Sequence, residues 1–217
     1  MILRVALVTM TAGHTAPNEG ASLFVAVAWQ DTEMYESSTQ DLYERVAARF
    51  GDLVESCRAE SWSAPSPCPG WTAWDVAAHV VRNHRRALAG LDGSRYSAPT
   101  RDEDVREAWR SASEGVRQAL RDPTLAGTQL AAEFDACTFE TFIRRMACAD
   151  MLIHTWDFAR ATGQDERLDP EGVAVAAYIL VPEDRDIRMP HAFGPKVSPA
   201  DDADPQTRLL NFLGRRP

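Results

Sequence analysis

The sequence predicts an all-α protein, an antiparallel four-helix bundle with a short irregular C-terminal extension. Apolar residues recur at helical spacing in four long segments, and Pro, Gly and capping residues separate these segments. A core can be built, because 45% of the 217 residues are hydrophobic and 25% are charged. Helices joined by short to moderate connections pack as neighbours, which favours a bundle.

Residues 1–33 stand apart from this pattern. They mix Gly, Pro, Thr and Asn with short apolar pieces and show no sustained period, whereas helical spacing begins soon after Met34. Either Met34 is the true initiator or the segment is a small packed extension, and we favour the first reading. The expected organisation is therefore an N-terminal appendage over 1–33 and a metal-binding bundle with its tail over 34–217.

The first two bundle helices are expected over residues 38–61 and 72–88. Three prolines over 65–70 cannot continue a helix, so they form a stiff connector between the two. Thr72 then offers a hydroxyl cap, and Asp75 follows three residues later as in a capping box. The second helix therefore begins at a defined point.

The remaining elements follow in order along the chain. A third helix is expected over 100–121, and the weak alternation over 127–138 indicates a small hairpin. The fourth helix spans 139–161 and ends at Gly163, a C-terminal signal. A shorter helix follows Pro170, and a last turn or two covers 206–213.

Three residues form a candidate metal site. Asp150 and His154 are four apart on the fourth helix, so they share one face beside the apolar stripe. A buried carboxylate is costly unless it is paired or binds a cation. His79, at the margin of the stripe of the second helix, can supply a third ligand, and two His with one carboxylate suit a catalytic divalent metal. A satisfied histidine at the edge of the core is the other reading of His79.

Other polar residues near these three have less specific roles. Asp157 lies three residues beyond His154 and can orient its imidazole, or it can pair with Arg160 instead. We expect Cys68 to serve packing in the loop before the second helix. His84, five residues beyond His79, is expected at the surface because it lies on another side of the helix.

Composition excludes several classes of function. The net charge of −9, with acids and bases mixed, disfavours binding to nucleic acid or to anionic membranes. No apolar run is long enough to span a bilayer. The four cysteines form no CxxC pair, so neither a disulfide framework nor a thiolate zinc site is indicated. A reducing cytoplasm is the expected location, although residues 5–10 weakly imitate a signal peptide.

Three blocks of sequence resemble a known family. Trp62, the Pro-rich stretch 65–71 and Asp75-Val76-Ala77-Ala78-His79 resemble the start of the second helix in the mycothiol-dependent maleylpyruvate isomerase N-terminal family, part of the DinB/YfiT-like superfamily. Residues 150–163 resemble the metal helix of that family. The ending, residues 193–217, is similar to the tail of one actinobacterial branch.

The resemblance covers residues 34–217 and implies a DinB-like bundle holding one divalent metal. The ligands of the family fall on His79, Asp150 and His154. The isomerase has Glu where this chain has Asp150, so a shorter side chain must reach the metal, and its affinity or metal preference is expected to shift. The isomerase also has a separate C-terminal domain that helps bind substrate. The part of this chain after Pro170 is too short to supply that domain, which argues against maleylpyruvate isomerisation.

The function expected from this resemblance is metal-dependent chemistry with a low-molecular-weight thiol, mycothiol, as co-substrate. The thiol is either transferred to a small electrophile or used transiently in an isomerisation. Zinc is the first expectation for the metal, with Ni, Mn or Fe as alternatives. A non-catalytic metal- or ligand-binding bundle and a metal-hydroxide hydrolase stay open. The sequence assigns neither catalytic nor thiol-binding residues, and it leaves monomer and homodimer open.

Overall fold

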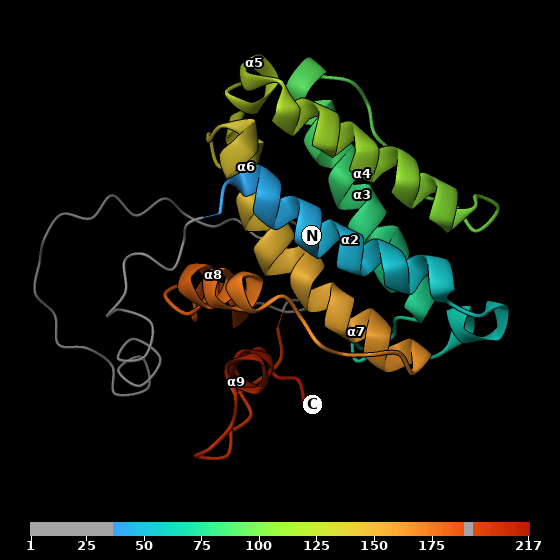
Figure 1. Ribbon diagram of the computed structural model, residues 1–217, viewed down its shortest axis with the longest axis vertical. Helices are drawn as coiled ribbons and strands as arrows, with labels where there is room; N and C mark the ends of the chain where they lie inside the picture. Colours follow the sequence, from blue (N-terminus) through green and yellow to red (C-terminus); the bar gives the residue numbers. More distant parts are fainter. Residues whose placement is uncertain (1–36, 189–192) are drawn as a thin grey trace, which may run out of the picture.

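The computed structural model describes residues 37–188 and 193–217, and Figure 1 shows them as packed helices. Within these two ranges the secondary structure is helical, with two isolated β-bridges and no strand. The all-α prediction is confirmed. The expected appendage, residues 1–33, lies outside the described residues.

Four long helical segments form the bundle. They are α2 (Thr39–Ser56), α3 (Ala73–Asp92), α4 (Val105–Arg121) and a fourth segment made of α6 (Phe139–Met146) and α7 (Leu152–Thr162). The first helix ends earlier than predicted, and Ala59–Ser63 forms a separate 3-10 turn. Thr72 and Asp75 form the predicted capping box of α3.

A π-helical turn, Ala147–Met151, interrupts the fourth segment between α6 and α7. The sequence predicts one continuous α-helix here. A π turn closes its hydrogen bonds over five residues instead of four and so accommodates one more residue per turn, and such turns are frequent at functional sites. Asp150 lies in this turn, and His154 lies in the first turns of α7.

The helices are arranged so that α2 and α3 lie at opposite corners, each packed against α4 and against the fourth segment. Arg117 near the end of α4 pairs with Glu44 near the start of α2, so these two helices are antiparallel. Arg101, just before α4, pairs with Asp75 in the first turn of α3, so α3 and α4 run in the same direction. The connection over 93–104 returns the chain to the starting end. The predicted antiparallel arrangement therefore holds for α2 and α4 but not for α3 and α4.

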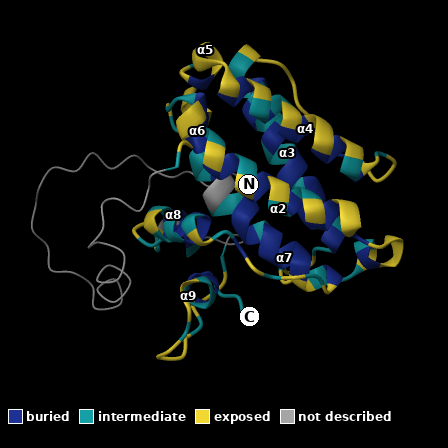
Figure 2. Ribbon diagram, viewed as in Figure 1, coloured by how far each residue is buried: buried dark blue, intermediate teal, exposed yellow. Residues whose placement is uncertain are grey.

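Because α3 packs against two neighbours, it buries two faces (Figure 2). The expectation that His84 lies at the surface is therefore wrong: its side chain is fully buried. Its ring lies 4.9 Å from Trp109 of α4 and 5.8 Å from Tyr43 of α2, centroid to centroid. The Nδ1 atom of His84 is bonded to the Val80 carbonyl at 2.8 Å, and its Nε2 has no partner in the described structure.

The segment predicted as a hairpin does not form two paired strands. A single bridge joins Gln129 to Thr138, and Ala132–Phe134 between them forms a 3-10 turn. The short helix α5 (Pro123–Ala126) precedes it. Two paired residues are too few to make strands, so this segment serves as a compact connection.

Two further helices follow the bundle. They are α8 (Pro170–Leu180), which packs against the π-helical turn, and α9 (Pro205–Phe212), which packs against α8. Each begins with Pro behind a capping aspartate, Asp169 and Asp204 respectively. The C-terminal extension therefore brings its last residues back to the bundle, as Figure 1 shows beside α7 and α8.

Among the described helices, none is both long and apolar enough to cross a bilayer. Among the described side chains, Cys57, Cys68 and Cys137 are free thiols.

Candidate metal centre

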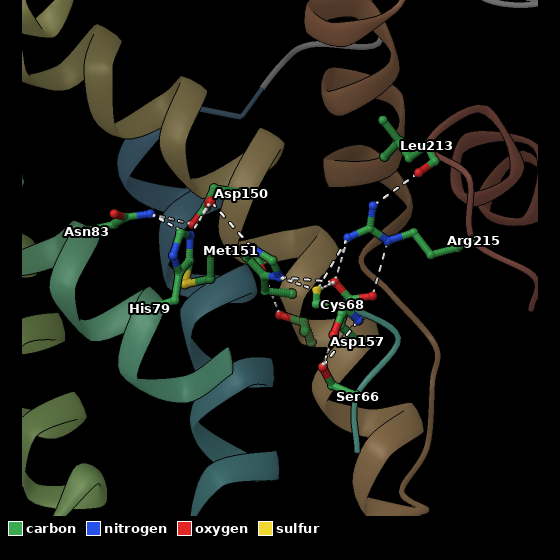
Figure 3. A network of polar contacts seen from close by, with 11 residues as sticks. Ser66, Cys68, His79, Asn83, Asp150, Met151, Asp157, Leu213 and Arg215 are labelled. Atoms are coloured by element: carbon green, nitrogen blue, oxygen red, sulfur yellow. Dashed lines mark hydrogen bonds and ion pairs between the residues drawn. The ribbon is translucent and has the colours of Figure 1, made fainter. Parts of the chain in front are cut away.

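His79, Asp150 and His154 come together across the interface between α3 and the fourth segment. His79 Nε2 lies 2.9 Å from Asp150 Oδ1, and His154 Nε2 lies 3.6 Å from the same oxygen. One ligand atom from each of the three lies within 4.8 Å of the others. Figure 3 shows Asp150 and His79 facing each other from two helices. The three residues singled out from the sequence thus form one cluster.

The spacing of these atoms fits a small divalent ion. Two ligands at about 2.1 Å from a tetrahedral zinc lie about 3.4 Å apart. The separation of His154 and Asp150 is already close to that value, whereas His79 and Asp150 would have to open by about 0.5 Å. Two imidazoles and one carboxylate also leave an open position, as in catalytic sites.

Asn83 and Arg82 complete the surroundings of His79. Asn83 Nδ2 donates to Asp150 Oδ2 at 2.9 Å and so holds the second carboxylate oxygen. Arg82 Nη2 lies 2.9 Å from His79 Nδ1. A guanidinium can only donate, so Nδ1 accepts this bond and Nε2 carries the hydrogen that points at Asp150. Asn83 Nδ2, which lies 3.0 Å from the same Nε2, is then a close contact and not a hydrogen bond, because both nitrogens are donors. Neither residue was singled out from the sequence, where each is an ordinary polar residue on a helix.

The two histidines of the cluster differ in protonation. Burial lowers the pKa of His79, although the Asp150 charge opposes this shift. Burial also opposes the charge on His154, but Asp150 and the contacts with Asp157 and Cys68 outweigh it and raise the pKa of His154 to about 10. The pKa of Asp150 lies well below its usual range because both imidazoles outweigh its burial. Without a metal, the cluster is a neutral histidine, a carboxylate and an imidazolium.

Asp157 lies on the far side of His154. Its Oδ2 is 3.0 Å from His154 Nδ1, and its side chain is fully buried. Arg160 pairs with Glu166 and not with Asp157. The partner of Asp157 is instead Arg215, which donates from Nε to Oδ1 at 3.1 Å and from Nη2 to Oδ2 at 2.8 Å.

Cys68 approaches this second group more closely than a packing role requires. Its Sγ donates to Asp157 Oδ2 at 3.2 Å and lies 3.9 Å from His154 Nδ1. Cys68, His154 and Asp157 thus make a second possible ligand group. Arg215 Nη2 lies 3.8 Å from the sulfur and already supplies a positive charge there. The first cluster is therefore the better candidate for a metal ion.

An aromatic ring covers the histidines. The Trp71 ring lies 4.9 Å from His79 and stacks on His154 at 5.8 Å, centroid to centroid. The two imidazoles meet edge to face at 4.8 Å. Trp71 therefore shields one side of the cluster with apolar surface.

The cluster opens into a pocket of about 1340 Å³. Three acidic residues line it, Asp135, Asp150 and Glu183. A larger number of arginines line it as well: Arg82, Arg86, Arg145, Arg160, Arg188, Arg215 and Arg216. Four of these arginines pair with carboxylates: Arg145 with Asp135, Arg160 with Glu166, Arg188 with Asp184 and Arg215 with Asp157. Arg82 and Arg86 contact the His79 ring and the Glu133 backbone carbonyl instead, so they supply positive charge to the pocket wall although the whole chain carries −9.

Comparison with known proteins yields relatives without an assigned activity. Two proteins of Mycobacterium tuberculosis, named uncharacterized protein MT0763 and uncharacterized protein Rv0738, are each 28% identical over 177 residues. These matches cover 80% of this chain and 95% of each relative. No solved structure matches the chain. The family model described as the mycothiol maleylpyruvate isomerase N-terminal domain matches residues 43–159, more than half of the 217 residues, and the chain belongs to that family.

Proposed function

We propose that this protein is a metal-dependent enzyme that uses a low-molecular-weight thiol, mycothiol, as a nucleophile. The thiol is transferred to a small electrophilic substrate or assists its isomerisation. The single observation that carries the proposal is the cluster of His79, Asp150 and His154 on the wall of a large pocket. The family to which the chain belongs supports the choice of thiol.

His79, Asp150 and His154 would hold one divalent ion, with zinc as the first choice and Ni, Mn or Fe as alternatives. Nitrogen and carboxylate donors suit all of these metals. A bound metal of this kind lowers the pKa of a thiol, so that thiolate is present near neutral pH. Three protein ligands would leave a further position, and a thiol would approach it from the pocket because all three residues line that pocket.

Other residues of the chain prepare the site. Asp157 accepts from His154 Nδ1, which sets the ring so that Nε2 faces Asp150. Trp71 keeps water from one side of the two imidazoles. Arg82 and Arg86 favour an electrophile that carries negative charge, since both line the pocket and contact the His79 ring and a backbone carbonyl rather than a carboxylate. No residue is assigned as general base.

The experiment follows thiol consumption by zinc-loaded protein. Mycothiol is incubated with a neutral electrophile, such as monochlorobimane, or with an unsaturated carboxylate, and adducts are measured by mass spectrometry. We expect adduct formation or isomerisation that requires the metal and is lost in His154→Ala. A faster reaction with the unsaturated carboxylate than with the neutral electrophile would support a preference of the pocket arginines for negatively charged substrates.

Two other outcomes would contradict this proposal. Metal binding with unchanged thiol and electrophiles would indicate a non-catalytic binding protein. Metal-dependent hydrolysis of ester or amide substrates without thiol would indicate a hydrolase that uses activated water.

A further inference from the structure

The segment that follows α9 reaches into the candidate metal centre. Its residue Arg215 makes a two-point contact with Asp157, from Nε to Oδ1 and from Nη2 to Oδ2. The side chain of Asp157 is 0% exposed and that of Arg215 is 11% exposed. A guanidinium that binds both oxygens of a carboxylate fixes the plane of the carboxylate as well as its position.

Asp157 connects this contact to a candidate ligand. The oxygen that accepts from Arg215 Nη2 is the same Oδ2 that faces His154 Nδ1 at 3.0 Å. Figure 3 shows Asp157 with Arg215 on one side and the group around Asp150 on the other. A rotation of the Asp157 carboxylate would therefore change the direction of the hydrogen bond that orients the His154 ring.

We propose that Arg215 is a positioning residue of the metal centre, which holds Asp157 in the orientation that aligns His154. The proposal rests on the proposed function only in taking His154 as a metal ligand. It assigns a role to the C-terminal segment, whose residues lie far from the ligands in sequence.

The backbone around Arg215 is itself held in place. Gly214 has φ of +82°, and a Cβ added there would lie 2.8 Å from the Pro195 carbonyl oxygen. The Arg215 amide donates to the Leu210 carbonyl at 2.8 Å, and Asn211 Nδ2 donates to the Arg215 carbonyl at 3.0 Å. These contacts fix where the Arg215 side chain starts, so its approach to Asp157 does not depend on the side chain alone.

An ion pair with only a structural role would leave the metal centre unchanged in a folded variant. The experiment therefore measures the affinity for zinc, and the visible spectrum of bound Co²⁺, in Arg215→Gln and Arg215→Lys. We expect Arg215→Gln to weaken zinc binding about tenfold and to shift the Co²⁺ bands. Arg215→Lys keeps the charge but not the two-point contact, so its zinc affinity should lie between those of Arg215→Gln and the wild type.

A second set of variants tests whether Arg215 acts through Asp157. In the Asp157→Asn background, Arg215→Gln should change zinc affinity less than about twofold, because the group through which it acts is already altered. Arg208→Gln is the matched control. It removes an arginine of α9 that, among the described residues, binds the backbone carbonyls of Ala203 and Asp201, so the zinc affinity of this variant should equal that of the wild type.

Gly214→Ala covers the case in which Arg215→Gln does not fold. It leaves Arg215 in the chain but forces the backbone away from Pro195, so the same shift of the Co²⁺ bands is expected. Wild-type affinity and spectrum in folded Arg215→Gln, or fully additive effects with Asp157→Asn, would overturn this inference alone. Absence of zinc and Co²⁺ binding by the wild-type protein would overturn the proposed function together with it.

Discussion

His79 and Asp150 face each other from two helices, with 2.9 Å between Nε2 and Oδ1. The hydrogen on Nε2 of His79 lies in the direction in which this nitrogen would offer its lone pair to a metal. His79 and Asp150 are therefore hydrogen-bonded to each other without a metal and would be adjacent ligands with one. This dual character leads to the first two predictions.

Asp150→Asn should lower metal affinity by tenfold or more, about 1.4 kcal/mol, because it removes the negative charge but keeps the shape. Asp150→Glu should retain metal with a modest loss, since the longer side chain keeps the charge and an oxygen donor. Metal titrations of the two variants side by side measure this order. The reverse order would mean that Asp150 is a structural carboxylate, with Glu harmful through overpacking at about 1–3 kcal/mol.

Arg82→Gln should raise metal affinity about fivefold, roughly 1 kcal/mol, as for one hydrogen bond gained. Metal at Nε2 of His79 leaves the hydrogen on Nδ1, where Arg82 offers only donors at 2.9 Å. Glutamine offers an oxygen that can accept that hydrogen. Calorimetric titration with zinc checks the change.

Arg86→Gln controls for the loss of positive charge. It removes an arginine of the same pocket that donates to the Glu133 carbonyl and not to His79. An equal rise in metal affinity in both variants would show that the loss of positive charge alone accounts for the effect. It would contradict the explanation based on the Nδ1 hydrogen.

His84 should make the fold sensitive to acid. Burial lowers its pKa to about 4 from the ordinary 6.5, so the unfolded chain binds a proton at a higher pH than the folded one. Stability from this group is complete above about pH 6.5 and is lost as pH falls toward 4, by up to about 3 kcal/mol. Urea unfolding of wild type and His84→Gln from pH 7.5 to 4 should give a flatter profile for the variant. Parallel profiles would show that His84 does not carry this dependence.

The protein should bind one divalent ion per chain without using Cys68. The place beside Cys68 already holds the Arg215 guanidinium, and the sulfur donates its hydrogen to Asp157. Cys68→Ser keeps a donor there and should leave the metal content at about one equivalent. A thiolate-to-Co²⁺ charge-transfer band in the wild type that disappears in this variant would instead make Cys68 a ligand.

A protein that begins at Met34 should fold and bind metal like the full chain. Both the helical periodicity and the family resemblance begin after that residue. Thermal unfolding and elemental analysis of the shortened chain check this. A fall in Tm of more than about 10 °C exceeds what one peripheral contact of about 1 kcal/mol explains, and would show that residues 1–33 are part of the packed fold.

The helices of the bundle could be predicted because their signals are local. Apolar spacing and caps such as Thr72 act within one or two turns, and the structure places α3 where they indicate. His84 was misplaced because the sequence does not reveal that α3 has packing partners on two sides. The direction of α4 relative to α3 depends on the path of the 93–104 connection, which carries no periodic signal.

The candidate ligands could also be found from sequence, because Asp150 and His154 are close along one helix and His79 falls in a recognisable block. Arg215 could not be assigned a contact in this way. Its partner Asp157 is 58 positions away, and only the folding of α8 and α9 brings the two together. Arg82 was missed because its role depends on which ring nitrogen of His79 faces Asp150.

The π-helical turn at Ala147–Met151 has a consequence for length variation in this helix. Deletion of one residue in the turn would restore regular α-helical bonding, but it would rotate α6 by about 100° relative to α7. Ile143, fully buried on α6, would then leave the core if His154 stayed at the site. A substitution in this turn leaves the register between α6 and α7 unchanged, whereas a single-residue deletion forces a choice between core packing and the ligand cluster.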